Sequence, residues 1–396
     1  MRLYHNYLFL FGFLYYMVFP VLMVQNHFLH DFEPMQPVYD YYPNESKMHL
    51  YWILILIIFI SFYLGSNTAK RISHNRLLLQ DKLHFIEIKK TKLSWWIFIP
   101  MVIVDQFLIV SNRHLLFTGY VNIFDVDTPV QGQVASFNCL FAFIYICLSQ
   151  NTKGSLLRKR CLLLLFVENS VFLLSTGSRQ YFMVPLIAFF VWALDKKMIP
   201  IKKIIIGASI MAIFFIAVGI WRSGEGMVSL SEITSFAFMG ESLYTWLSAA
   251  SFMSNNTGVN LVDIPLNFIG WFLNFIPSLF LDKSELVQDV AYNYSNPWGA
   301  VNMIVSSYGN FGLLFTPVFI FAGGFFMSYM RYKNSDIWRS AYYCSCGVIP
   351  FMIFRDMQSA TKIVFMCFIF YPAFLISVKT IKKRFSQINN EILSSK

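Results

Sequence analysis

The amino-acid sequence predicts an all-α protein that crosses a membrane many times. Its 396 residues are 57% hydrophobic and only 13% charged, with 43 Phe and a mean hydropathy of +0.54. A soluble chain carries about twice that share of charged residues, so the composition excludes the ordinary soluble classes. Apolar runs of roughly 17 to 25 residues, the length that lets a helix cross about 30 Å of hydrocarbon, recur along the whole chain.

Ten spans are expected, each an apolar run that ends at polar or charged residues. The run at 181–194 is short, so we expect this helix to tilt or to continue into its neighbours. The expected spans are residues 7–24, 50–65, 93–112, 133–149, 161–176, 181–194, 204–221, 311–330, 338–354 and 361–378.

The positions of Lys and Arg orient these spans. If the N-terminus is inside, 24 of the 31 basic residues fall at the inner ends, which is the bias of cytoplasmic loops. Both termini are then cytoplasmic. The net charge of +10 is explained by these loops lying beside anionic lipid, and no nucleic-acid partner is needed. The basic segments are residue 2 and residues 70–92, 153–160, 196–203, 331–339 and 379–396.

Residues 1–396 are therefore expected to form a single transmembrane domain with two long outer loops, 25–49 and 222–300. Within the second loop, residues 231–254 have apolar side chains at alternating steps of three and four, which predicts an amphipathic helix with Glu241 on its polar face. Residues 264–281 are apolar and interrupted by prolines, which favours a segment in the outer interface. If both segments crossed instead, the spans would number twelve.

Three arginines are the informative charges of the outer face. Arg179, Arg222 and Arg355 each lie near the outer end of a span, where Lys and Arg are otherwise scarce. One interpretation is that each is an anchor or pairs with a nearby carboxylate, Arg222 with Glu225 and Arg355 with Asp356. The other is that they converge on a cavity and bind an anion, since guanidinium groups match phosphate oxygens in a bidentate way.

Other chemistry-bearing residues give weaker signals. Asp105 and Glu168 lie within expected spans, as proton relays or as polar packing partners. The seven His residues show no metal-ligand spacing, the six Cys fit buried thiols, and no phosphate-binding glycine loop is present. We therefore expect neither a metal site nor a cofactor.

Three short motifs carry a resemblance to a known family. They are "STGSRQ" at residues 175–180, "NPWGAVNMIVSSYGNFGLL" at 296–314 and the late "FR" at 354–355. Together with the span layout and the long outer loop before the last three spans, they resemble the bacterial O-antigen polymerase family, Wzy. The resemblance covers most of the chain in layout.

The resemblance implies a fold like that of the metal-independent multispanning glycosyltransferases, which include the O-antigen ligases. It implies an inner-membrane enzyme of lipopolysaccharide and related polysaccharide biosynthesis that joins lipid-linked repeat units on the periplasmic side. The growing glycan would pass from undecaprenyl diphosphate to a sugar hydroxyl of a new lipid-linked unit. Membrane lipid surrounds such an enzyme, and a chain-length regulator protein is left open as a further partner.

On this interpretation Arg179, Arg222 and Arg355 hold the leaving diphosphate, and Glu241 is the candidate base. Preorganised cations stabilise the charge that develops as the anomeric bond breaks. Further substrate contacts are expected in the outer loop and in "YGNFG". These are Lys283, Asp289, Tyr308 and Asn310.

Two other functions remain open from the sequence. A metal-assisted lipid-phosphate-sugar glycosyltransferase would carry carboxylates in its first outer loop, where "HDFEP" places Asp31 and Glu33. A flippase or transporter of lipid-linked oligosaccharide would instead carry charges deep in the bundle, and the long outer loop argues against it. The sequence does not specify the sugars joined or the oligomeric state.

Overall fold

The computed structural model describes most of the chain, and every regular element in the described part is a helix. The predicted all-α class is therefore confirmed for these residues. They are 2–80, 95–117, 130–150, 156–203, 205–207, 209–211, 213, 230–255, 261–273, 275–276, 294, 300–333 and 335–371.

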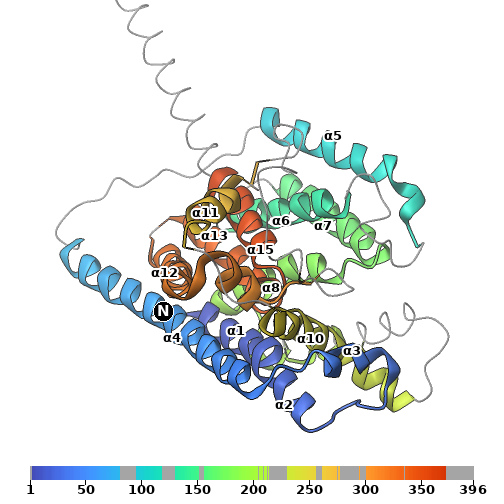
Figure 1. Cartoon of the computed structure of the whole chain (residues 1–396). Helices are drawn as coiled ribbons and strands as arrows, with labels where there is room; N and C mark the ends of the chain where they lie inside the picture. The colour runs from blue at the N-terminus through green and yellow to red at the C-terminus, as the bar shows by residue number, and fades with distance from the viewer. Residues whose placement is uncertain are drawn as a thin grey trace, which may run out of the picture.

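The helices follow the order of the expected spans. Figure 1 shows them as a bundle in which the long α4 runs beside α1 and α12, while α5 lies at the edge. Their bounds are α1 Tyr4–Phe13, η1 Leu14–Val18, α2 Phe19–Gln25, η2 Glu33–Met35, α3 Gln36–Asp40, α4 Glu45–Gln80, α5 Trp95–Ser111, η3 Arg113–Leu115, α6 Val130–Ser149, α7 Leu156–Ser175, α8 Arg179–Asp195, α10 Leu230–Asn255, α11 Ile264–Leu273, α12 Met303–Tyr332, α13 Asp336–Val348, α14 Met352–Arg355, α15 Met357–Ile363 and η6 Val364–Phe370.

Four of these helices are long and apolar enough to cross a bilayer by themselves: Tyr4–Gln25, Glu45–Ser73, Val130–Ser149 and Met303–Tyr332. Phe98–Ser111, Ile264–Leu273 and Met357–Phe370 are shorter apolar helices. The described residues of each expected span except 204–221 coincide with a helix, although the helix at 338–354 is interrupted between α13 and α14. Residues 93–94 and 372–378 of two expected spans lie outside the described residues. Most of the 204–221 span lies outside the described residues.

The α4–α12 pair forms the longest helix contact, and two glycines allow it. An added Cβ on Gly65 would lie 2.0 Å from the Phe321 carbonyl oxygen, and one on Gly324 would lie 2.1 Å from the Phe62 carbonyl oxygen. Each backbone therefore packs directly against the other, which is how small residues bring membrane helices together.

α12 contains a kink within the "YGNFG" motif. Gly312 has φ +65°, a conformation that favours glycine, and it interrupts the helix after Phe311. At the kink the Asn310 carbonyl accepts a hydrogen bond from the Asn267 Nδ2 of α11, 3.0 Å away. The Trp271 Nε1 of α11 donates to the Thr361 Oγ1 at 3.1 Å. The motif thus docks α11 onto the bundle.

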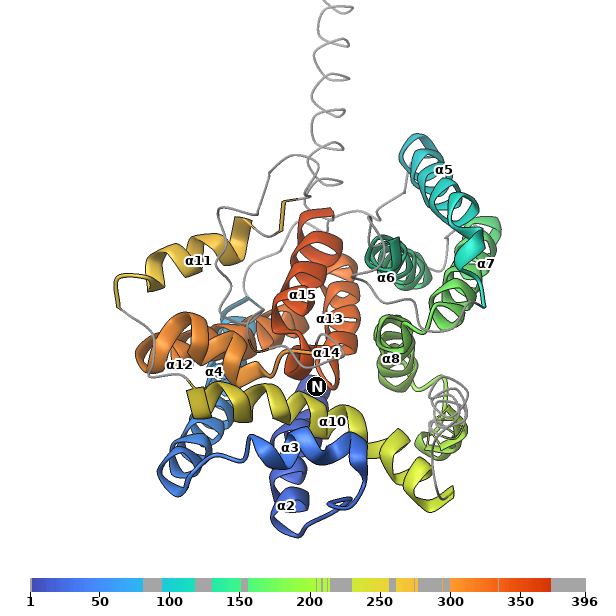
Figure 2. The same ribbon diagram turned by 45° about the vertical axis from the view of Figure 1, so that its right-hand side comes forward.

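α10 forms where the sequence predicts an amphipathic helix, but its polar face is largely buried. Its predicted apolar positions, such as Leu243 and Trp246, are buried, but so are Thr245 and Ser248 on the opposite side. The Thr245 hydroxyl donates to the Glu241 carbonyl at 2.8 Å, and the Ser248 Oγ accepts from the Asn302 backbone N–H at 3.2 Å. α10 packs against α2, α3, η1 and α12, and Figure 2 shows it lying across this end of the bundle.

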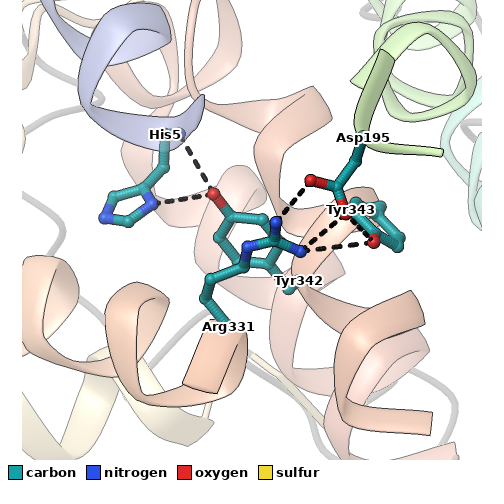
Figure 3. A network of polar contacts seen from close by, with 5 residues as sticks. All are labelled: His5, Asp195, Arg331, Tyr342 and Tyr343. Carbon is teal, nitrogen blue, oxygen red and sulfur yellow. Dashed lines mark hydrogen bonds and ion pairs between the residues drawn. The ribbon is translucent and has the colours of Figure 1, made fainter. Parts of the chain in front are cut away.

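At the opposite end of the helices, a buried polar network joins α1, α8, α12 and α13 (Figure 3). Arg331 forms an ion pair with Asp195, and its Nη1 lies 2.9 Å from Asp195 Oδ2. The Tyr343 hydroxyl donates to the same carboxylate at 2.5 Å, and the Tyr342 hydroxyl lies 3.1 Å from the His5 Nδ1. The side chains of Arg331 and Asp195 are only 4% and 18% exposed, so this pair is structural.

The network extends to α4. The His5 Nε2 lies 3.0 Å from the Ser66 Oγ, which in turn lies 2.9 Å from the Ser328 Oγ of α12. His5, Asp195 and Arg331 lie at helix ends that the Lys and Arg distribution predicts to be cytoplasmic. Arg331, which the sequence places among the loop cations, is therefore a buried partner that fixes the helix ends.

Candidate functional site

The candidate site is a charge cluster centred on Glu241, in the middle of α10. Its Oε1 lies 2.8 Å from the Arg355 Nη1 at the end of α14, and the Tyr16 hydroxyl of η1 donates to the same oxygen at 2.8 Å. The side chains of Glu241 and Arg355 are 25% and 17% exposed. Three segments far apart in the sequence therefore meet at one partly dry carboxylate.

Arg355 is positioned by the backbone around it. The Arg355 carbonyl accepts a hydrogen bond from the Val301 N–H at 2.6 Å, which joins α14 to the residues before α12. The side chain of the next residue, Asp356, accepts from the Ser359 N–H at 3.0 Å and caps α15. Pairing of Arg355 with Asp356 was one sequence interpretation, but the ion pair of Arg355 is formed with Glu241.

Arg179 acts on the same cluster. Its positive charge lowers the pKa of Glu241, as the charge of Arg355 does, so two of the three predicted outer arginines act electrostatically on one carboxylate. Arg179 is the first residue of α8, and its position is set by the turn that precedes it.

That turn is "TGSR", a helix C-cap followed at once by a new helix. Gly177 has φ +78°, its N–H donates to the Leu174 carbonyl at 3.1 Å, and the Ser178 N–H donates to the Leu173 carbonyl at 2.8 Å. This is the Schellman arrangement, which needs glycine at the left-handed position. The Thr176 hydroxyl is buried and donates to the Phe172 carbonyl at 3.1 Å. The small residues therefore end α7 and start α8 at Arg179.

Tyr16 is a site residue that the sequence reasoning missed. It lies in η1, a π-helical turn inside the first span, and such turns occur often at functional sites. Its neighbour Tyr15 donates to the Phe238 carbonyl, so both hydroxyls reach α10. The available signal was a pair of adjacent tyrosines in the middle of the first apolar span.

The electrostatics keep Glu241 ionised. Burial raises the pKa of Glu241, but Arg355, Arg179 and the hydrogen bond from Tyr16 outweigh it, and the net pKa is lowered. A carboxylate with a lowered pKa is a weak proton acceptor at neutral pH. The geometry therefore suits an orienting anion between cations better than a general base.

The remaining predicted site residues lie apart from this cluster or outside the described residues. Asn310 is buried in α12, where its Nδ2 donates to the Ser306 carbonyl at 2.8 Å. The Tyr308 ring packs edge-on against Phe252 with centroids 6.0 Å apart. The Asn310 hydrogen bond lies within α12, and the Tyr308 ring packs α12 against α10. Outside the described residues lie Arg222, Lys283 and Asp289.

The polar residues of α5 and α7 join these two helices. Buried Asp105 accepts from the Asn169 Nδ2 at 3.0 Å, and Glu168 accepts from the Gln106 Nε2 at 2.7 Å. In these contacts Asp105 and Glu168 are polar packing partners, one of the two interpretations given by the sequence.

The first outer loop does not gather metal ligands in the described part of the chain. Asp31 is fully exposed, and its Oδ1 lies 3.2 Å from the His30 Nδ1. Among the described residues no group of three or more His, Cys, Asp or Glu side chains is placed to hold a metal ion.

Comparison with known protein families gives a match over residues 2–385, to the model described as O-antigen polysaccharide polymerase Wzy. The chain belongs to the O-antigen polysaccharide polymerase Wzy family. Searches of curated proteins and of solved structures found no match. The family covers nearly the whole chain, so the resemblance carried by "TGSR", "YGNFG" and "FR" is confirmed. Of the three functions that the sequence left open, membership of the Wzy family supports O-antigen repeat-unit polymerisation by a membrane protein.

Proposed function

We propose that this Wzy-family protein polymerises oligosaccharide repeat units carried on undecaprenyl diphosphate, and that the cluster of Glu241, Arg355 and Arg179 binds the diphosphate. The observation that carries the proposal is the ion pair of Arg355 with Glu241, together with Arg179, whose charge lowers the pKa of the same carboxylate. The Arg355 side chain is 17% exposed, so its guanidinium lies at a partly dry position, where it binds an anion more strongly than in water.

The proposed reaction is a glycosyl transfer. A hydroxyl oxygen of the acceptor unit forms a bond to the anomeric carbon of the growing glycan. The bond between that carbon and the diphosphate oxygen breaks, its electron pair stays on the diphosphate, and the hydroxyl proton passes to water. Negative charge therefore develops on the diphosphate, where fixed guanidinium groups lower the energy of the transition state.

Within this proposal Glu241 is a positioning residue. Its carboxylate holds the Arg355 guanidinium and the Tyr16 hydroxyl at 2.8 Å each, which fixes the direction of the donors before substrate arrives. Fixed donors cost little reorganisation during the reaction. Arg222, if it joins the cluster as the sequence predicts, adds a third cation.

The proposal places the protein in the bacterial inner membrane with both termini in the cytoplasm and the cluster facing the periplasm. Two observations support it. In the predicted topology the basic loops fall on one side, and the helix ends that they predict to be cytoplasmic meet in the network of Arg331 and Asp195. The Glu241 cluster lies at the other ends of the same helices.

The test is chain extension by the purified protein with synthetic undecaprenyl-diphosphate-linked repeat units. We expect Arg355→Ala and Arg179→Ala each to lower kcat/KM by about 100-fold or more, the usual effect of removing a donor to developing charge. Arg113→Ala is the matched control, since Arg113 is an exposed arginine after α5. Full activity of both cluster variants, beside an active wild type, would exclude the diphosphate role.

A further inference from the structure

A buried polar pair, apart from the Glu241 cluster, joins α5 to α7. Its members are Asp105 of α5 and Asn169 of α7, whose side chains are fully buried. The Asn169 Nδ2 donates to the Asp105 Oδ1 at 3.0 Å. Within the described residues, the other two oxygens of the pair, Asp105 Oδ2 and Asn169 Oδ1, have no hydrogen-bond partner. One bond therefore joins the two groups, and each group keeps one oxygen without a donor.

In the described part of the chain, no cation forms an ion pair with Asp105. The charged group that acts on Asp105 is Glu168, which is itself negative. α6, which also packs against α5, carries no Asp, Glu, His, Lys or Arg. The His and basic residues nearest in sequence to the pair lie eight or more positions away, more than two helical turns. They are Arg113, His114 and Arg160.

An apolar layer covers the pair on the predicted outer side. Ile109, four residues beyond Asp105, belongs to a hydrophobic cluster with Phe172 and Leu173, which follow Asn169 on α7. All three side chains of this layer are buried. An ionised carboxyl without a partner is strongly disfavoured in such surroundings, and the group takes up a proton instead.

A single proton would satisfy both unpaired oxygens. A carboxylic acid and a primary amide can form a cyclic pair, in which the acid O–H donates to the amide oxygen and the amide N–H donates to the acid carbonyl. The second of these bonds is present, from Asn169 to Asp105. A proton on the Asp105 Oδ2 supplies the first, with the Asn169 Oδ1 as its acceptor.

We propose that Asp105 carries a proton in the folded protein, and that the neutral pair of Asp105 and Asn169 is a pH-sensitive contact between α5 and α7. Figures 1 and 2 show α5 at the edge of the bundle, beside α7. Loss of the proton leaves two acceptor oxygens facing each other without a hydrogen, so alkaline pH weakens the attachment of α5. The inference concerns residues outside the Glu241 cluster and does not depend on the proposed polymerase activity.

The first experiment is infrared spectroscopy of the protein reconstituted in lipid, because the C=O stretching band of a protonated carboxyl is separate from the carboxylate bands. At neutral pH we expect this band in the wild type, and we expect it to weaken as the pH is raised. Asp105→Asn should remove it. Glu168→Gln is the matched control, since Glu168 is an exposed carboxyl on α7 whose partner is Gln106 at 2.7 Å, and it should keep the band.

Two infrared results would overturn the inference. One is a wild type without any protonated-carboxyl band at neutral pH, a result that needs no variant to fold. The other is a band of unchanged strength in Asp105→Asn.

The second experiment follows thermal unfolding of the same three proteins from mildly acidic to alkaline pH. Asparagine at position 105 can form the same cyclic pair with Asn169 but carries no titratable proton. The wild type releases one proton on unfolding, so above the ordinary carboxyl range its unfolding equilibrium constant should rise about tenfold per pH unit until the folded carboxyl ionises. Glu168→Gln should share this slope.

Asp105→Asn should match the wild type at mildly acidic pH and exceed it in alkaline buffer. The opposite result, a variant that is less stable than the wild type by the same amount at every pH, would show that Asp105 is ionised and paired, and the inference would be wrong. Chain extension by the wild type is a separate measurement, so the polymerase proposal stands or fails independently of these results.

Discussion

Substitution of Gly324 by alanine tests the contact between α4 and α12. The added Cβ would lie 2.1 Å from the Phe62 carbonyl oxygen and 3.0 Å from the Phe62 carbonyl carbon. Real Cβ atoms essentially never approach another atom closer than 3.0 Å, so α4 must move away by roughly 1 Å. The contacting atom belongs to backbone, so no side chain can rotate away to relieve the clash.

The magnitude follows from two opposing contributions. Overpacking of this kind costs about 1 to 3 kcal/mol. Replacing a helical glycine by alanine gains about 1 kcal/mol of helix propensity. Gly323→Ala provides the second contribution alone, because a Cβ there meets nothing within 4 Å. The difference between the two variants therefore isolates the steric cost, and we expect Gly324→Ala to be less stable than Gly323→Ala by about 1 to 3 kcal/mol.

The assay is thermal unfolding of both variants and the wild type in the same detergent, followed by loss of the monodisperse peak in size-exclusion chromatography. Gly323→Ala should equal or exceed the wild type in midpoint temperature, and Gly324→Ala should fall below both. Equal midpoints for the two variants would refute the close backbone approach of α4 and α12. Gly65→Ala, whose Cβ would lie 2.0 Å from the Phe321 carbonyl oxygen, should reproduce the loss from the other helix.

Three further predictions concern the polar contacts. The pKa of Glu241 is lowered, so its ion pair stabilises the folded protein fully at pH values above the ordinary carboxyl pKa, and this stability is lost as the pH falls through the lowered pKa. Glu241→Gln should therefore lose less stability in acid than the wild type, as unfolding curves recorded at a series of pH values measure. Arg331→Met or Asp195→Leu should each cost about 3 to 5 kcal/mol because one buried charge is left, whereas the double variant Arg331→Met/Asp195→Leu should cost less than the sum, as a double-mutant cycle measures. Gly177→Ala should destabilise by about 1 kcal/mol and Gly177→Asn by less, since Gly177 has φ +78°; equal unfolding midpoints for the two would contradict the cap.

The sequence predicted the helices well because their signal is local. An apolar run of sufficient length can satisfy its backbone in a membrane only as a helix, so composition alone locates α1, α4 and α12. The positions of Lys and Arg also predicted which helix ends lie on the same side of the bundle, and the helix ends around Arg331 do meet. The sequence could not predict that Arg331 is buried against Asp195, because the two are 136 positions apart and no local pattern joins them.

The short motifs have structural roles that the sequence did not reveal. "TGSR" was singled out for Arg179, and in the structure Gly177 ends α7 while Thr176 bonds to helix carbonyls. "YGNFG" was expected to contribute substrate contacts, and in the structure Gly312 bends α12 where α11 docks. In both cases a glycine required by backbone geometry resembles a glycine that makes room for a ligand, and only φ distinguishes them.

The two ends of the bundle differ in a way that favours one of them as the site. At the predicted cytoplasmic end, Arg331 and Asp195 carry equal and opposite charge, and Tyr343 bonds to both. At the other end Arg355 pairs with Glu241, and both side chains keep part of their surface exposed. Arg179 adds a second positive charge, which lowers the pKa of the same carboxylate. A guanidinium that is held in place and still partly exposed can bind phosphate oxygens in a bidentate way, which is the physical argument for proposing the outer end as the diphosphate site.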